Sequence, residues 1–357
     1  MDSAVLTRRT LLSGGAGLAA GGLLAGCGDD PHLGRPEPAP GKAWDGPVEQ
    51  VSVLTGVGFQ GREAPIAVAV AKGFFASAGL EVKTLAGRGT TGNLQLLKGG
   101  SATFATLDVS GAIMEMSRPD GINGFWLTSL LHRRNLACFM ARQGSGIKTA
   151  RDLAGRTVTF VPGGINYLLF ATYATLSGFD AKSVRWRPAG QPEHAKLLAA
   201  GRVDAISQFV PGRVAVEAVA GPVTVLPFTD VLADIHGSAV AVTDQTATGK
   251  PAMVRRFNQA LLRGLKYTLD HPDEAAAIYL AQPEAKTQKL PAVLGEIESL
   301  RGYVHLTTPS PQTVPLGHFD PARLMQNISI LQGAKQIPEG LTPDRVAKFD
   351  LAGDPVT

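Results

Sequence analysis

The residues best placed to do chemistry in this 357-residue chain are glycines and small polar residues that follow apolar, strand-like segments. The segment Pro162-Gly163-Gly164-Ile165-Asn166 joins a predicted strand at 156–161 to a predicted helix. A glycine turn that enters a helix presents free backbone N–H groups, which bind anions or carbonyl oxygens. This turn is therefore the first candidate ligand contact.

Four other loops follow predicted strands in the same way, at 56–60, 87–92, 107–110 and 208–211. They supply hydroxyl, amide and carboxylate groups, together with aromatic rings that can stack on a flat ligand. The complete set of predicted ligand-binding residues is Gly58, Phe59, Gly89, Thr90, Thr91, Asp108, Gly163, Gly164, Ile165, Asn166, Tyr167, Gln208 and Phe209.

Patterns typical of enzymes and metal sites do not occur in the sequence. There is no GxSxG, HExxH or P-loop motif and no CxxC pair, and the seven histidines never stand at metal-ligand spacing. The formal charge of +4 comes without a basic stripe interleaved with aromatics, which argues against nucleic-acid binding. We expect a binding protein with no metal, no cofactor and no catalytic residues.

Two stretches in which strand-like and helix-like patterns alternate must position these loops. The first runs from Val51 and the second from Arg156, and LLKGGSATFA at 96–105 resembles LLAAGRVDAI at 197–206. Strand–helix–strand order predicts an α/β fold with two lobes, each a mainly parallel sheet flanked by helices, and a ligand cleft between them. Apolar strands at 136–141 and 238–243 are the expected crossovers. Lobe 1 is then 48–143 plus 237–357, and lobe 2 is 144–236.

The first 47 residues differ in character from the rest of the chain. Arg8-Arg9 precedes a glycine-rich apolar run of about 15 residues, which is signal-peptide anatomy and shorter than the ~20 residues of a membrane span. The twin arginines resemble a twin-arginine export motif, and Leu24-Ala25-Gly26-Cys27 resembles the lipobox of bacterial lipoproteins. We predict that 1–26 is removed, that Cys27 is lipidated, and that 27–47 is a flexible tether outside the cell membrane.

Replacing Cys27 by alanine should release the protein from membranes and leave ligand binding intact, because the lipid on this thiol is the expected anchor. Fractionation of cells that express each form, together with a binding assay, measures both effects. A correctly processed variant that stays in the membrane fraction contradicts the anchoring prediction.

Four ordered segments carry a resemblance to a known family. The segment 71–82, AKGFFASAGLEV, is similar to a signature of the binding proteins for thiamine pyrimidine precursors, aliphatic sulfonates, taurine and nitrate. The segments 146–158, 201–205 and 257–275 match later motifs of the same family in the same order. The resemblance implies a type II periplasmic-binding-protein fold and a monomeric partner of an ABC permease, which closes its lobes on a small solute and delivers it.

Two departures from the family pattern bear on function. Thr103 stands where the family commonly has aspartate, and we expect this position, like Asp204, to serve structure rather than ligand. The cysteine-rich motif of the eukaryotic pyrimidine-synthase relatives is absent, which counts against an enzyme. A secreted enzyme of that kind is the alternative class. The long helical C-terminal half and the aromatics near the cleft favour a thiamine pyrimidine precursor as solute. A sulfonate, taurine or nitrate is the alternative, with Arg62, Arg88 and Arg213 as candidate anion ligands.

Overall fold

The computed structural model describes residues 44–233, 235–304 and 314–356. The predicted signal peptide and Cys27 lie outside these residues. The predicted tether, 27–47, ends earlier than expected, because Trp44 already contacts the folded part of the chain. Its backbone N–H donates to the Ser77 carbonyl (3.1 Å), and its ring lies 3.8 Å from the Arg256 guanidinium.

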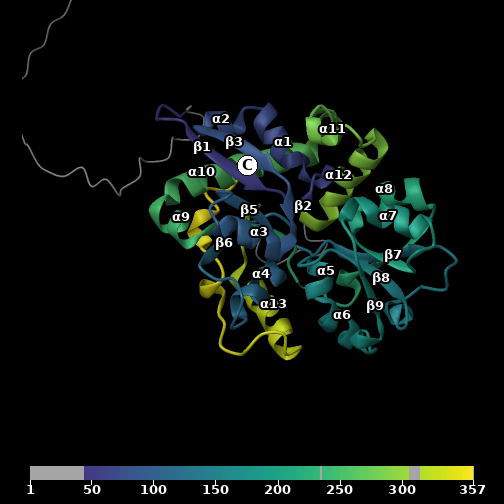
Figure 1. Cartoon of the computed structure of the whole chain (residues 1–357). Coiled ribbons are helices and arrows are strands. Elements are labelled where there is room, and N and C mark those ends of the chain that lie inside the picture. Colours follow the sequence, from purple (N-terminus) through teal and green to yellow (C-terminus); the bar gives the residue numbers. More distant parts are fainter. Residues whose placement is uncertain (1–43, 234, 305–313, 357) are drawn as a thin grey trace, which may run out of the picture. The chain divides into compact units, whose positions relative to one another are not determined.

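Two five-stranded sheets form the framework (Figure 1). The first has the order β3-β1-β5-β12-β6 and the second the order β11-β7-β10-β8-β9. All strands of the first sheet run parallel except β12, and all strands of the second except β7. This confirms the predicted α/β fold with mainly parallel sheets. The strands are β1 (Glu49–Leu54), β3 (Leu80–Leu85), β5 (Phe104–Asp108), β6 (Phe125–Leu130), β7 (Ala137–Arg142), β8 (Thr157–Phe160), β9 (Arg185–Pro188), β10 (Ala205–Phe209), β11 (Val223–Pro227) and β12 (Ser238–Thr243).

The expected division of the chain after residue 143 does not match the sheets. β7 pairs with β10 and β11 of the second sheet, so the chain changes sheets between β6 and β7, before residue 137. It returns between β11 and β12, close to the expected second crossing. The apolar run of β7 is fully buried from Ala137 to Ala141, and such a run indicates a buried strand without indicating which sheet it joins.

Helices cover both faces of each sheet because successive strand side chains point to opposite faces. In β5, Phe104 packs against α10, while Ala105 and Leu107 face the core beneath α3 and α4. In the second sheet, Phe139 packs on α6 and Met140 faces α7 and α8. The helices on the first sheet and in the C-terminal half are α1 (Ala64–Ala71), α2 (Phe74–Ser77), α3 (Gly89–Lys98), α4 (Val109–Ser117), α9 (Asp244–Gly249), α10 (Pro251–Asp270), α11 (Pro272–Leu280), α12 (Leu290–Val304) and α13 (Pro321–Gly333). Those on the second sheet are α5 (Ile165–Leu168), α6 (Phe170–Leu176), α7 (Gln191–Ala199) and α8 (Arg213–Ala220).

The internal repeat seen in the sequence corresponds to equivalent positions in the two sheets. Thr103 precedes β5, and its Oγ1 accepts a hydrogen bond from the backbone N–H of Ser52 in β1 (3.2 Å). Asp204 precedes β10, and its Oδ2 accepts one from the backbone N–H of Thr157 in β8 (2.8 Å). Both side chains therefore tie a central strand to its neighbour, which confirms that these positions serve structure.

Among the described residues, no helix has the length and apolar character needed to cross a membrane. The same residues contain no group of three or more histidine, cysteine or acidic side chains arranged to hold a metal ion.

Candidate functional site

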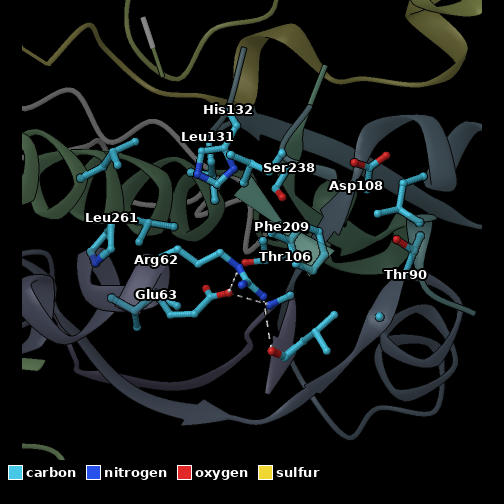
Figure 2. Close-up of a pocket in the computed structure, with 18 residues that line it drawn as sticks. Arg62, Glu63, Thr90, Thr106, Asp108, Leu131, His132, Phe209, Ser238 and Leu261 are labelled. Carbon is cyan, nitrogen blue, oxygen red and sulfur yellow. Dashed lines mark hydrogen bonds and ion pairs between the residues drawn. The ribbon is translucent and has the colours of Figure 1, made fainter. Parts of the chain in front are cut away.

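A pocket opens where loops and strand ends of both sheets meet (Figure 2). The empty space inside it is about 760 Å³, with the open solvent at its mouth included. The first sheet and its helices supply most of the wall, while β10 supplies Phe209 and α5 supplies Ile165. The lining residues are Gly56, Val57, Arg62, Glu63, Pro65, Ile66, Gly89, Thr90, Thr106, Asp108, Leu131, His132, Leu136, Ile165, Phe209, Ser238, Leu261 and Leu265.

Five of the thirteen predicted ligand-binding residues line this pocket: Gly89, Thr90, Asp108, Ile165 and Phe209. They come from β5, from β10 and from the first residues of α3 and α5, as expected for the carboxyl ends of strands. Their contact with a ligand remains a prediction. The other eight do not line the pocket: Gly58, Phe59, Thr91, Gly163, Gly164, Asn166, Tyr167 and Gln208.

Two glycine-rich loops that were predicted to hold ligand contact each other. The backbone N–H of Thr91 donates to the Gly163 carbonyl (3.4 Å), and a Cβ added to Gly89 would meet that same carbonyl oxygen at 3.3 Å. Gly89 and Gly163 have φ values of +82° and +71°, in the region that favours glycine. These loops therefore join the first sheet's side of the pocket to the second sheet's side.

Asn166 and Tyr167 follow the glycine turn on α5 but are not among the residues that line the pocket. The Asn166 Nδ2 donates to the carbonyls of Cys138 and Gln208, both at 2.9 Å, and so fastens α5 to β7 and β10. The Tyr167 ring stacks on Phe160 with ring centroids 4.4 Å apart, and 41% of the residue is exposed. Asn166 therefore has a structural role, and Tyr167 belongs to a surface aromatic cluster.

Gln208, Gly58 and Phe59 also make local contacts. The Gln208 Oε1 accepts hydrogen bonds from Gln191 Nε2 and from the backbone N–H of Phe209, the latter at 2.9 Å. The Gly58 carbonyl accepts from Thr55 Oγ1, and the Phe59 carbonyl accepts from Gln288 Nε2 (3.1 Å). These groups already have partners within the protein.

Arg62 is the central polar residue of the pocket, although it is only 7% exposed (Figure 2). Its guanidinium carbon lies 4.3 Å from the centre of the Phe209 ring, within the range of a cation–π contact. Its Nε lies 3.5 Å from Glu63 Oε1, and its Nη2 donates to the Val57 carbonyl (3.4 Å). The guanidinium plane is therefore held by contacts on two of its nitrogens and by the ring.

Three buried polar atoms on the pocket wall have no hydrogen-bond partner among the described residues: Arg62 Nη1, Thr106 Oγ1 and His132 Nδ1. An unsatisfied buried donor or acceptor costs on the order of 1–3 kcal/mol, and such groups are uncommon in folded proteins. Their presence in three lining residues is expected of a site completed by a polar ligand or by water.

Burial governs the protonation of the groups around the pocket. It lowers the pKa of His132 to about 3, with help from the nearby Arg62 charge, so this imidazole is neutral at pH 7. It raises the pKa of Glu63, against the Arg62 charge. It also raises the pKa of Asp108 to about 7, although hydrogen bonds from the Gly111 N–H (3.1 Å) and Asn135 Nδ2 (2.7 Å) favour the carboxylate.

Replacing Asp108 by asparagine should change how stability depends on pH. Folding raises this pKa from 3.8 to about 7, so between these values the native state binds more protons than the unfolded chain. Its contribution to the free energy of unfolding therefore falls as pH rises, by roughly 2–3 kcal/mol from pH 5 to pH 8. The wild-type stability minus the variant stability should fall by that amount in urea unfolding measured across this range.

The histidines do not disturb this comparison. Burial lowers the pKa of His132 to about 3 and that of His236 to about 4. Their contributions to the free energy of unfolding therefore rise with pH up to about 6.5. Both histidines are present in wild type and in the variant, so these contributions cancel in the difference. A stability difference that is constant from pH 5 to pH 8 contradicts the assignment to Asp108.

Several lining residues were not predicted from the sequence. Arg62 was named only as a possible anion ligand, and Glu63, Thr106, His132 and Ser238 were not named as ligand contacts. Arg62 and Glu63 lie two and three residues after the candidate loop at 56–60, so extending that loop would have found both. His132 lies two residues after the end of β6, where no loop was proposed. The apolar wall from α10 gave no comparable signal, because Leu261 and Leu265 read as ordinary core positions.

Comparisons with known proteins agree with this architecture. A riboflavin-binding protein, RibY of Chloroflexus aurantiacus, is 29% identical over 233 residues, which cover 62% of this chain and 64% of RibY. The alkanesulfonate-binding protein SsuA of Xanthomonas axonopodis has a TM-score of 0.65 at 13% identity, with 84% of this chain and 99% of SsuA covered. The nitrate-binding protein NrtA of Synechocystis has 0.65 at 14% identity, with 85% and 87% covered.

An enzyme shares the same fold. The desulfurization enzyme DSZB has a TM-score of 0.53 at 17% identity, with 85% of this chain and 97% of DSZB covered. Structural likeness at such identities establishes the fold and no more. The family is established from the sequence itself: the model described as NMT1/THI5 like matches residues 60–275, more than half of the chain. This chain therefore belongs to the NMT1/THI5-like family.

Proposed function

We propose that this chain is an exported solute-binding protein of an ABC importer, and that it captures a flat, uncharged heteroaromatic solute and delivers it to a permease. The fold and the family support a binding protein, and several fold neighbours bear the names of such proteins. The solute we favour is a pyrimidine precursor of thiamine or a related heterocycle. RibY, named as a riboflavin-binding protein, is a precedent for a heteroaromatic ligand.

The observation that carries this proposal is the side chain of Arg62. Its guanidinium lies against the Phe209 ring with Nη1 unsatisfied, in a wall otherwise built largely from apolar side chains. A flat heterocycle can place its faces on apolar and aromatic side chains and an edge oxygen or nitrogen on Arg62 Nη1. The neutral His132 and the Thr106 hydroxyl can complete hydrogen bonds to the same ligand.

Isothermal titration of the purified protein tests the choice of solute. The ligand panel contains 4-amino-5-hydroxymethyl-2-methylpyrimidine, riboflavin, taurine, ethanesulfonate and nitrate. We expect saturable binding of one of the two heterocycles and none of the anions. Binding by the sulfonates or nitrate alone would overturn the heteroaromatic assignment. Conversion of a bound heterocycle to product would support the alternative of an enzyme.

Export and lipid anchoring belong to the same proposal. A protein that delivers solute to a permease must stay near the membrane, and a lipidated Cys27 followed by a polar tether meets that need. The predicted leader and lipobox support this placement, with the protein on the outer face of the cell membrane. The Cys27→Ala fractionation described above tests it separately from the solute.

A further inference from the structure

We propose that Glu63 and Glu296 set the charge selectivity of the pocket, by neutralising Arg62 so that it accepts uncharged ligands and rejects anions. This inference rests on the proposed binding function and extends it to the residues that decide between the two solute classes. A buried arginine with a free N–H group would otherwise be the expected centre of an anion site.

Glu63 lies beside Arg62 in the short turn Gly61–Glu63 and lines the pocket. Its Oε1 lies 3.5 Å from Arg62 Nε and accepts a hydrogen bond from the backbone N–H of Gly56 (3.3 Å). Its side chain is only 10% exposed, so water screens this pair little. The carboxylate therefore faces the same space that a ligand contacting Arg62 would enter.

Glu296 comes from α12, more than 230 residues further along the chain. Only 2% of it is exposed, and its Oε2 accepts a hydrogen bond from the backbone N–H of Arg62 (3.1 Å). The absence of a side chain on Gly61 permits this approach, since a Cβ there would lie 3.0 Å from the Val293 Cα. The helix thus delivers a second buried carboxylate to the base of Arg62.

The charge count around the guanidinium is therefore unfavourable for an anion. Arg62 is the only lysine or arginine among the residues that line the pocket, and two buried carboxyl groups adjoin it. Burial raises the pKa of both carboxyl groups, and the Arg62 charge opposes that rise and favours their charged form. An anion that left water would bear a large desolvation cost and meet no net positive charge. An uncharged acceptor on a heterocycle can still take the hydrogen bond from Nη1 without carrying a charge into the pocket.

The variants Glu63→Gln and Glu296→Gln test this selectivity. Glutamine keeps the shape and an oxygen that can accept the backbone hydrogen bonds from Gly56 and Arg62, while the negative charge is lost. Glu298→Gln is the matched control, because Glu298 lies on the same helix and is exposed. Titrations of ethanesulfonate and riboflavin, at two salt concentrations, give the dissociation constants.

We expect each of the two buried variants to bind ethanesulfonate at least tenfold more tightly than wild type does, with an affinity that falls at high salt. Where wild type binds riboflavin, the ratio of the ethanesulfonate to the riboflavin association constant should rise in each buried variant and stay at its wild-type value in Glu298→Gln. Unchanged ethanesulfonate affinity in both folded variants would overturn the inference, as would an equal gain in Glu298→Gln. If Glu296→Gln does not fold, Glu63→Gln alone decides the result.

The two proposals fail in different ways. If wild type binds neither heterocycle, the proposed solute is wrong, while a gain of ethanesulfonate binding in Glu63→Gln would still support the proposed charge selectivity. If wild type binds a heterocycle and the variants gain no anion affinity, the proposed solute stands and the proposed charge selectivity is wrong.

Discussion

Replacing Arg62 by methionine should reduce affinity for the solute by at least a hundredfold and lower the free energy of unfolding by about 3–5 kcal/mol. The ligand loses the unsatisfied Nη1 donor and the cation that lies on the Phe209 ring. The protein loses the positive charge beside Glu63 and Glu296, and breaking a buried ion pair leaves its carboxylates uncompensated. Titration calorimetry and urea unfolding measure the two effects.

A second substitution at Arg62 separates the role of charge from that of shape, and a substitution at Arg88 serves as the control. Arg62→Lys keeps a positive charge but removes the planar fork, so it should restore part of the stability and little of the binding. Arg88→Met is the matched control, because Arg88 is exposed and does not line the pocket. A folded Arg62→Met protein that binds as wild type does would show that Arg62 is not a ligand contact.

Replacing Gly163 by alanine should weaken solute binding by about tenfold or more, because the added methyl group obstructs the contact between the two loops at the pocket. Its Cβ would lie 2.9 Å from the Thr91 Cβ, closer than side-chain carbons pack, and the 87–92 loop would have to move. When two lobes close on a ligand, the surfaces that carry these loops must meet. We therefore expect the substitution to destabilise the closed, ligand-bound form.

Gly155→Ala provides a control with the same backbone cost. Gly155 has a φ of +73°, close to the +71° of Gly163, but a Cβ there would meet nothing within 4 Å. Both variants should lose on the order of 1–2 kcal/mol of stability from the left-handed backbone, and only Gly163→Ala should lose affinity. Adding Thr91→Gly to Gly163→Ala should recover binding. Equal affinities in the two alanine variants would contradict a role for this contact.

The features of the fold that local pattern specifies could be predicted from the sequence. In the sequence, Val254, Phe257, Leu261 and Leu265 recur with a helical period, which puts them on one face of a helix, and all four are buried in α10. The helix starts at Pro251, as expected for a residue that lacks an N–H donor and favours the first turn. Hydrophobic burial sets such elements nearly independently of the rest of the chain.

The pocket was predicted less well because it depends on contacts between distant residues. Loops after strands were the right place to search, yet neighbouring side chains on one helix, Ile165 and Asn166, point in different directions. The burial of Arg62 depends on Glu296, and no local pattern links a turn at residue 62 to a helix at 290–304. Likewise, β7 belongs to the second sheet because it pairs with β10 and β11, and the sequence of β7 alone does not specify these partners.

The position of β12 has a consequence for synthesis of the chain. β12 lies between β5 and β6, but 107 residues separate the end of β6 at Leu130 from the start of β12 at Ser238. At ~5–20 residues per second, the ribosome needs roughly 5–20 s to make that stretch. Until then β5 and β6 each have an unpaired edge of apolar strand, which is the kind of surface that aggregates. A pause between residues 131 and 237 would lengthen this exposure, whereas the same pause after residue 243 would not.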